Sequence, residues 1–117
     1  MANRIQDGTW VFYNCIVGYR FHTGRVNGGD QVLLEREPNN PVDPNAIVAK
    51  IITEPHTVIG YIPARTAAIL APWIDKNKFE IVKTQVARTF KIDIVRDNVP
   101  IPIEITLSTK MMAPSDF

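Results

Sequence analysis

A proline-rich loop holds the polar side chains best suited to recognising a ligand: Asn39, Asn40, Asp43 and Asn45. Three prolines, at positions 38, 41 and 44, stand between them. Proline fixes its own φ and restricts the residue before it, so these amides and the carboxylate are held in one geometry. The alternative is that they only satisfy the backbone of a turn, which is their commonest role.

A second candidate is the run Arg20, Phe21 and His22, inside a segment bracketed by glycines at 18 and 24. A guanidinium beside aromatic rings can hold a phosphate while the rings stack on bases, which is how many proteins bind single strands. The alternative is that Phe21 belongs to the core and His22 is an ordinary exposed polar residue. Composition favours neither.

Basic residues gather in the C-terminal third, where residues 76–96 hold six basic and two acidic side chains. The whole chain carries a net charge of only +1, so no strong global field attracts nucleic acid or an anionic membrane. The bias is either the solvated face of alternating strands or a flank that contacts phosphates. The candidates for such a flank are Lys83, Arg88 and Lys91.

Catalytic groups do not form a convincing set. Cys15 could pair with His22 or His56, but it lies in an apolar run, where a free thiol is normally inert packing. Two histidines without ligand spacing do not indicate a metal site, and no Gly-rich phosphate loop is present. We therefore expect no enzyme, no cofactor and no metal.

The single cysteine excludes an internal disulfide and favours an intracellular protein, cytoplasmic if bacterial. The first residues lack the apolar region of a signal peptide, and no run of 18 apolar residues occurs. We expect no membrane partner. A length of 117 residues with 45% hydrophobic composition suits one domain, expected at 9–110 between a flexible lead-in at 1–8 and a flexible tail at 111–117.

The candidate binding residues must be positioned by short strands. Alternating or β-branched residues predict six strands, at 9–17, 31–37, 46–52, 58–62, 79–90 and 102–109. One helix should follow Pro63, with Ile69, Leu70, Trp73 and Ile74 forming an apolar stripe toward the sheet and a kink or restart at Pro72. Many short strands with one helix indicate a mainly β protein, either a small antiparallel β-barrel or a curled sheet.

The order of these motifs resembles the HIRAN domain over residues 11–109. The resemblance rests on Arg-Glu-Pro-Asn-Asn-Pro at 36–41, Asp-x-Asn-Ala-Ile at 43–47 and Gly-Tyr-Ile-Pro at 60–63, preceded by Gly-Tyr-Arg-Phe-His at 18–22. It implies an OB-like small antiparallel β-barrel with one or two flanking helices. HIRAN domains occur in DNA-remodelling translocases and nucleases and as stand-alone proteins, and the best-studied members bind the 3′-hydroxyl end of single-stranded DNA.

The resemblance also implies roles for individual residues. Arg20 would hold phosphate beside the bases stacked on Phe21 and His22, and the terminal sugar would meet Asn39, Asn40, Asp43 and Tyr61. A carboxylate repels a phosphate by about 4 kcal/mol at 4 Å for an effective dielectric of 20, whereas a 3′ hydroxyl donates a hydrogen bond to it.

The expected function is therefore a DNA-binding module without catalysis of its own, with a translocase or nuclease as a possible partner in trans. Two alternatives stay open. The chain could be a protein-interaction or scaffold module that has lost the DNA-end pocket, or an accessory domain of an enzyme that processes nucleic acid.

Overall fold

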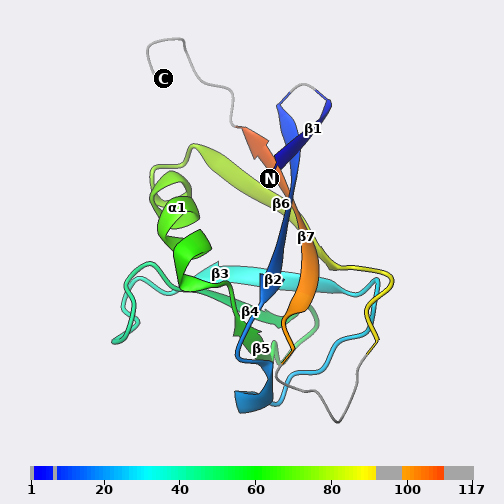
Figure 1. Cartoon of the computed structure of the whole chain (residues 1–117). Helices are drawn as coiled ribbons and strands as arrows, with labels where there is room; N and C mark the ends of the chain where they lie inside the picture. The colour runs from blue at the N-terminus through cyan, green and yellow to red at the C-terminus, as the bar shows by residue number, and fades with distance from the viewer. Residues whose placement is uncertain (1, 7, 92–98, 110–117) are drawn as a thin grey trace.

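The computed structural model describes residues 2–6, 8–91 and 99–109. The tail predicted at 111–117 lies outside them. The described residues form seven strands, β1 (Ala2–Gln6), β2 (Thr9–Ile16), β3 (Gln31–Arg36), β4 (Ile47–Ile51), β5 (Val58–Tyr61), β6 (Phe79–Val86) and β7 (Ile101–Thr109). They also form one α-helix, α1 (Ala64–Asp75), and one short 3₁₀ helix, η1 (Tyr19–Phe21) (Figure 1).

All paired strands are antiparallel and form one sheet in the order β1-β2-β7-β6-β3-β4-β5. The sheet curls until Val17, just after β2, exchanges two backbone hydrogen bonds of 2.8 and 2.9 Å with Tyr61 at the end of β5. This contact closes β2, β7, β6, β3, β4 and β5 into a small barrel and leaves β1 outside it. The predicted mainly β, antiparallel barrel is confirmed.

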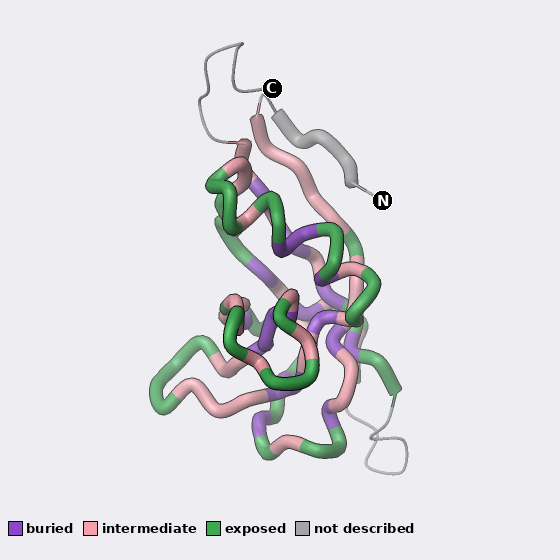
Figure 2. The backbone as a smooth tube through the Cα atoms, turned by 90° about the vertical axis from the view of Figure 1, so that its left-hand side faces the viewer, coloured by how far each residue is buried: buried purple, intermediate pink, exposed green. Residues whose placement is uncertain are grey.

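The core fills the inside of this barrel, and β7 shows why the chain folds this way. Its residues alternate, with Ile101, Ile103, Ile105 and Leu107 buried while their neighbours are partly or fully exposed. A strand with period two buries one face and leaves the other to solvent. Figure 2 shows the buried stretches gathered in the middle of the molecule, with exposed turns around them.

The predicted lead-in at 1–8 is wrong for residues 2–6, because β1 pairs with the first half of β2. Gly8 makes the reversal with a φ of 76°, and its carbonyl accepts the Thr109 N–H at 2.7 Å. Such pairing uses backbone groups, which a polar sequence supplies as well as an apolar one. The strand therefore leaves no apolar pattern from which it could be predicted.

Helix α1 begins directly after Pro63 and packs on the barrel through Ala67, Leu70 and Ala71. The predicted apolar stripe is wrong at Ile69, which is 62% exposed. Trp73 is 48% exposed, but its ring lies against that of Phe79 in β6, with centroids 5.8 Å apart. No helix among the described residues is long and apolar enough to cross a membrane.

Of the kink or restart predicted at Pro72, the restart is wrong, because α1 continues to Asp75 as one helix, and the kink stays a prediction. Proline cannot donate to the carbonyl of Ala68. Both residues are exposed, so that carbonyl can be solvated instead.

Candidate functional site

The proline loop (residues 38–45) joins β3 to β4 and is held by its own polar side chains. Asn40 Oδ1 accepts the N–H groups of Val42 and Asp43 at 2.9 and 3.0 Å, and Asp43 Oδ1 accepts the Asn45 N–H at 2.9 Å. These side chains therefore do satisfy a turn, as the simpler interpretation expects. The second Asp43 oxygen, Oδ2, makes no hydrogen bond or ion pair among the described residues, although the nearby Arg36 charge acts on this carboxylate.

Glu37, the last residue before the proline loop, links that loop to β5. Its Oε1 accepts the Tyr61 hydroxyl at 2.8 Å and the Asn40 amide Nδ2 at 2.9 Å. Burial, together with the Glu37 hydrogen bond and charge, raises the pKa of Tyr61 above its ordinary value of 10.0. Sequence reasoning missed Glu37, because its partner Tyr61 lies 24 residues away in the chain.

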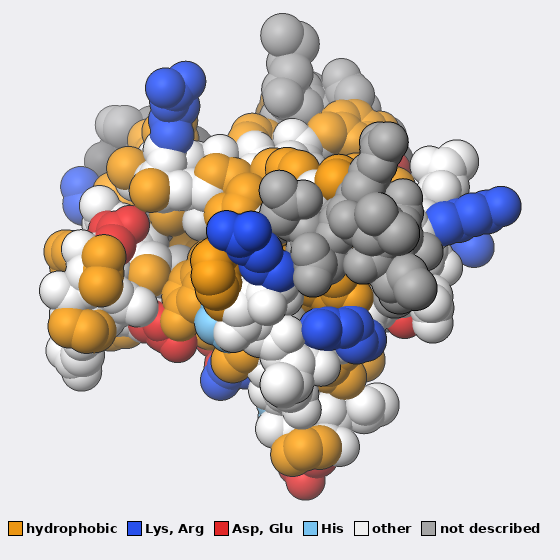
Figure 3. Space-filling view, turned by 60° about the horizontal axis from the view of Figure 1, so that its bottom comes forward, with side chains coloured by type: hydrophobic (Ala, Val, Ile, Leu, Met, Phe, Trp, Pro, Cys, Tyr) orange, Lys and Arg blue, Asp and Glu red, His pale blue; other side chains and the backbone are white. Residues whose placement is uncertain are grey.

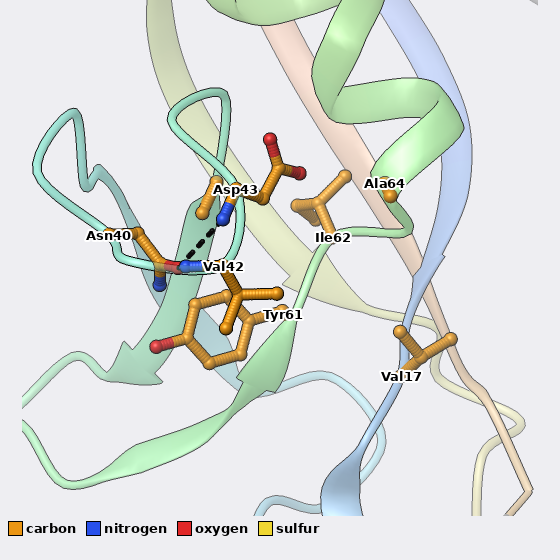
Figure 4. A pocket seen from close by; sticks show the side chains of 8 residues that line it. Val17, Asn40, Val42, Asp43, Tyr61, Ile62 and Ala64 are labelled. Carbon is orange, nitrogen blue, oxygen red and sulfur yellow. Dashed lines mark hydrogen bonds between the residues drawn. The ribbon is translucent and has the colours of Figure 1, made fainter.

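These residues surround a hollow of about 390 Å³, the Tyr61 hollow, lined by Val17, Asn40, Val42, Asp43, Ala46, Tyr61, Ile62 and Ala64. Its walls are mainly apolar, and Asn40, Asp43 and Tyr61 bring polar atoms to them (Figure 4). A second hollow of about 480 Å³ shares Asn40 and Tyr61 and is bounded by Glu37, Pro38, Asn39 and Pro41. Tyr61 therefore lines both.

The η1 segment brings the second candidate run to the same side of the barrel. The His22 ring lies against the Tyr61 ring, with centroids 5.8 Å apart, so Tyr61 joins the two sequence motifs. Phe21 is 72% exposed, and the Arg20 guanidinium lies over it at 4.7 Å from the ring centroid. The alternative that Phe21 belongs to the core is therefore wrong.

Tyr19, which precedes this run, supplies the buried anchor of η1 with 4% exposure. The Arg25 guanidinium lies 4.6 Å from the centre of its ring and donates to the carbonyls of His22 and Gly24 at 2.8 and 2.9 Å. Arg25 thus holds the chain that follows η1. Sequence reasoning gave Arg25 no role.

Arg36, at the end of β3, fixes the returning arm of the proline loop. Its Nη1 and Nη2 donate to the carbonyls of Ala46 and Pro44 at 2.8 and 3.0 Å. Its Nε and Nη2 donate to both carboxylate oxygens of Asp75, in the last turn of α1, at 2.9 and 2.8 Å. The Arg36 hydrogen bond and charge hold the pKa of Asp75 below its ordinary value of 3.8.

The predicted phosphate flank lies apart from this group. Lys83, Arg88 and Lys91 are exposed, and the turn that follows β6 packs on the turn at 27–30, at the start of β3. The proline loop follows the other end of β3, about 17 Å from that turn and so from Arg88 for a six-residue strand (Figure 1). Lys83 lies within β6, next to Thr84, which pairs with Val32 of β3. In Figure 3 the described Lys and Arg side chains stand separated by apolar and polar groups.

Cys15 is partly buried, and that burial raises the pKa of its thiol above the ordinary value of 9.0. That it is inert packing stays a prediction. Within residues 2–6, 8–91 and 99–109, no group of three or more His, Cys, Asp or Glu side chains could hold a metal ion.

Among models of protein families, that of the HIRAN domain matches residues 10–110. The helicase-like transcription factor of Oryctolagus cuniculus is 42% identical over 66 residues, which are 56% of this chain and 6% of that protein. The Fanconi-associated nuclease 1 homolog of Oryza sativa subsp. japonica is 39% identical over 67 residues, 56% of this chain and 7% of that protein. The chain thus spans a small fraction of the curated relatives it matches.

Solved structures agree in fold. The crystal structure of the HIRAN domain of human HLTF has a TM-score of 0.73 at 28% identity, over 91% of this chain and 84% of that one. The NMR structure of the HLTF HIRAN domain in its DNA-bound conformation has a TM-score of 0.67 at 28% identity, over 86% of this chain and 75% of that one. The expected OB-like barrel with a flanking helix is therefore confirmed.

Proposed function

The chain belongs to the HIRAN domain family, and we propose that it is a DNA-binding module that recognises the 3′-hydroxyl end of single-stranded DNA without catalysis of its own. The observation that carries the proposal is Asp43 Oδ2, which lies at the mainly apolar Tyr61 hollow and accepts no hydrogen bond from the residues that the structure describes. The similarity in fold to an HLTF HIRAN domain in its DNA-bound conformation supports the coarser part, DNA binding.

The charges around the Tyr61 hollow suit a hydroxyl end and oppose a phosphate. Asp43 and Glu37 place two carboxylates at the two adjoining hollows. Each would repel a bound phosphate, by about 4 kcal/mol at 4 Å for an effective dielectric of 20. A terminal hydroxyl instead donates to Asp43 Oδ2, while the apolar walls contact the sugar and base. The Asn40 amide completes the polar rim of the Tyr61 hollow, and Asn39 lines the adjoining hollow.

The bound DNA strand leaves the Tyr61 hollow along the side formed by η1. Tyr61, His22 and the exposed Phe21 offer successive aromatic surfaces, and stacking contributes about 1 to 3 kcal/mol per base. Arg20, which already lies over the Phe21 ring, is placed to neutralise a phosphate beside a stacked base. Lys83, Arg88 and Lys91 can reach only phosphates further along the strand.

Fluorescence anisotropy with one labelled oligonucleotide, ending in either a 3′ hydroxyl or a 3′ phosphate, tests the proposal. We expect the hydroxyl end to bind at least about tenfold more tightly at low salt. Asp43→Asn keeps the acceptor for the Asn45 N–H but removes the charge, so it should narrow that ratio. Equal affinities for the two ends in the wild-type protein, or no binding at low salt, would overturn the proposal.

The curated relatives favour a second proposal, that a helicase-like or nuclease protein acts on the DNA end that this module binds. The module then supplies the end recognition and its partner supplies the chemistry. Gel analysis of the oligonucleotide after prolonged incubation tests whether the module itself cleaves DNA. The DNA should stay intact with this protein alone, and its cleavage would show that the module is itself an enzyme.

A further inference from the structure

Arg36, at the end of β3, is bonded to the proline loop but is not among the residues that line the Tyr61 hollow. Its side chain is only 13% exposed, and its guanidinium bonds three partners at once. Two are carbonyls of the loop's returning arm, those of Pro44 and Ala46, and the third is the Asp75 carboxylate. One side chain therefore joins the loop to the last turn of α1.

The two bodies that Arg36 joins also form opposite walls of the Tyr61 hollow. Asp43 directly precedes Pro44, and Ala46 itself lines the hollow. Ala64, the first residue of α1, lines it from the helix. A shift of the returning arm relative to α1 would therefore move the Asp43 carboxylate relative to the wall that it faces.

We propose that the Arg36–Asp75 ion pair positions Asp43 for recognition of the DNA end, although neither of its residues lines the hollow. This inference rests on the function proposed above. Asp75 acts through Arg36, and Arg36 acts through the Pro44 and Ala46 carbonyls. Both residues are positioning residues rather than DNA contacts.

The geometry favours this local role over a general contribution to stability. The Asp75 side chain is 50% exposed, and ion pairs at exposed sites contribute little to the free energy of unfolding. The pair is nevertheless bidentate, with N–O distances of 2.9 and 2.8 Å, a geometry that fixes the plane of the guanidinium. Lysine could not make these contacts together, because its ammonium lacks the planar fork.

The same strand offers a matched control. Lys50 of β4 pairs with Glu35 of β3 at 2.6 Å, and Glu35 is 45% exposed, close to the value for Asp75. This pair contacts neither the proline loop nor α1 through any hydrogen bond or ion pair among the described residues. Glu35→Ala thus removes an equally exposed ion pair from β3 without touching the site.

The test compares Asp75→Ala with Glu35→Ala in the full chain, using oligonucleotides that end in a 3′ hydroxyl or a 3′ phosphate. We expect Asp75→Ala to weaken binding of the hydroxyl end by about three- to tenfold and to leave the phosphate end nearly unchanged. Glu35→Ala should change neither affinity. The double variant Asp75→Ala, Asp43→Asn should lose less affinity for the hydroxyl end than the sum of the losses in the two single variants. Both substitutions weaken the same contact, that of Asp43 with the 3′ hydroxyl. Asp75→Glu should restore part of the affinity.

Hydrogen exchange of backbone amides gives a readout that needs no DNA. In Asp75→Ala the Asp43 and Asn45 amides should exchange several-fold faster, while the amide of Ile105 in the core should keep its rate. If the wild-type protein does not distinguish the two DNA ends, the proposed function fails, and unchanged exchange in the loop would separately overturn the positioning role. A retained preference for the hydroxyl end in Asp75→Ala, or an equal loss in Glu35→Ala, would also overturn it.

Discussion

Three contacts fix the position of the Tyr61 side chain and backbone. Its hydroxyl donates to Glu37, its ring lies against His22, and its backbone bonds Val17 across the closing seam of the barrel. The residue that lines both hollows is therefore anchored at its backbone, its ring and its hydroxyl. A ligand in the Tyr61 hollow meets a preformed wall, which lowers the entropic cost of binding.

The ionisation of Tyr61 is the first prediction at this scale. Glu37→Gln removes a negative charge that disfavours the phenolate, so the pKa of Tyr61 should fall toward 10.0 while staying above it through burial. Because the folded-state pKa is raised, stabilisation by neutral Tyr61 is fully present below 10.0 and is lost as the pH rises through the folded-state pKa. A phenolate absorbance titration, with Tyr61→Phe subtracted, measures this. An unchanged pKa in Glu37→Gln would contradict it.

The residue types in the sequence predict which side chains of the proline loop lie near the Tyr61 hollow. They do not predict which other residues bond to that loop and fix its position. Asn40, Asp43 and Tyr61 line it together. Glu37 and Arg36 escape prediction because their partners are distant in the chain, 24 residues away at Tyr61 and 39 at Asp75. Nothing local distinguishes such a strand-end side chain from an ordinary solvated one.

At the scale of elements, helix α1 has two roles. Its first residue, Ala64, lines the Tyr61 hollow, and Asp75 in its last turn holds the proline loop through Arg36. The i, i+4 repeats of its sequence allow two neighbouring stripes, and packing against the barrel selects the one that includes Leu70 and leaves Ile69 exposed. The repeat alone could not decide between them, because both have helical spacing.

Helix α1 provides the second prediction. Pro72 is exposed and removes one donor from the helix interior, so Pro72→Ala lets an N–H reach the Ala68 carbonyl without loss of core packing. We expect the free energy of unfolding to rise by about 1 to 3 kcal/mol. Urea denaturation followed by circular dichroism measures it. A variant less stable than the wild-type protein would show that Pro72 makes contacts that the helix requires.

The link between α1 and the proline loop should respond to acid. The pKa of Asp75 is lowered by Arg36, so its stabilising contribution is present above its ordinary value of 3.8 and is lost as the pH falls through the folded-state pKa. Comparing unfolding free energies above and below 3.8 in the wild-type protein and in Asp75→Asn tests this. On acidification, the free energy of unfolding should fall more in the wild-type protein than in Asp75→Asn. An equal fall in both would contradict the ion pair between Asp75 and Arg36.

For the molecule as a whole, the barrel depends on close approach at its seam. A Cβ on Gly60 would lie 2.4 Å from the Val17 carbonyl oxygen and 2.7 Å from Ile16 Cγ2. Only glycine lets β5 reach the end of β2, which brings Tyr61 to the hollow. Alternation in the strands predicts a curled β protein, but closure depends on this long-range contact between Val17 and Tyr61, which no local pattern in the sequence reveals.

The seam gives the fourth prediction. Gly60→Ala should lower the free energy of unfolding by about 2 to 4 kcal/mol, because the new methyl group forces β5 away from Val17. Gly18→Ala is the control. Its added Cβ meets nothing within 4 Å, so only the strain of its positive φ remains, about 1 to 2 kcal/mol. Thermal denaturation of both variants should show the larger loss at Gly60, and equal losses would contradict the account of closure.

The central claim is that the Tyr61 hollow binds the end of a single strand, and NMR titration of the labelled protein with a short oligonucleotide tests it most directly. With a 3′-hydroxyl end, the largest amide shifts should fall on Asn40, Asp43 and Tyr61, and a 3′ phosphate should reduce them. Shifts concentrated at Arg88 and Lys91, with the hollow unperturbed by either end, would contradict the claim.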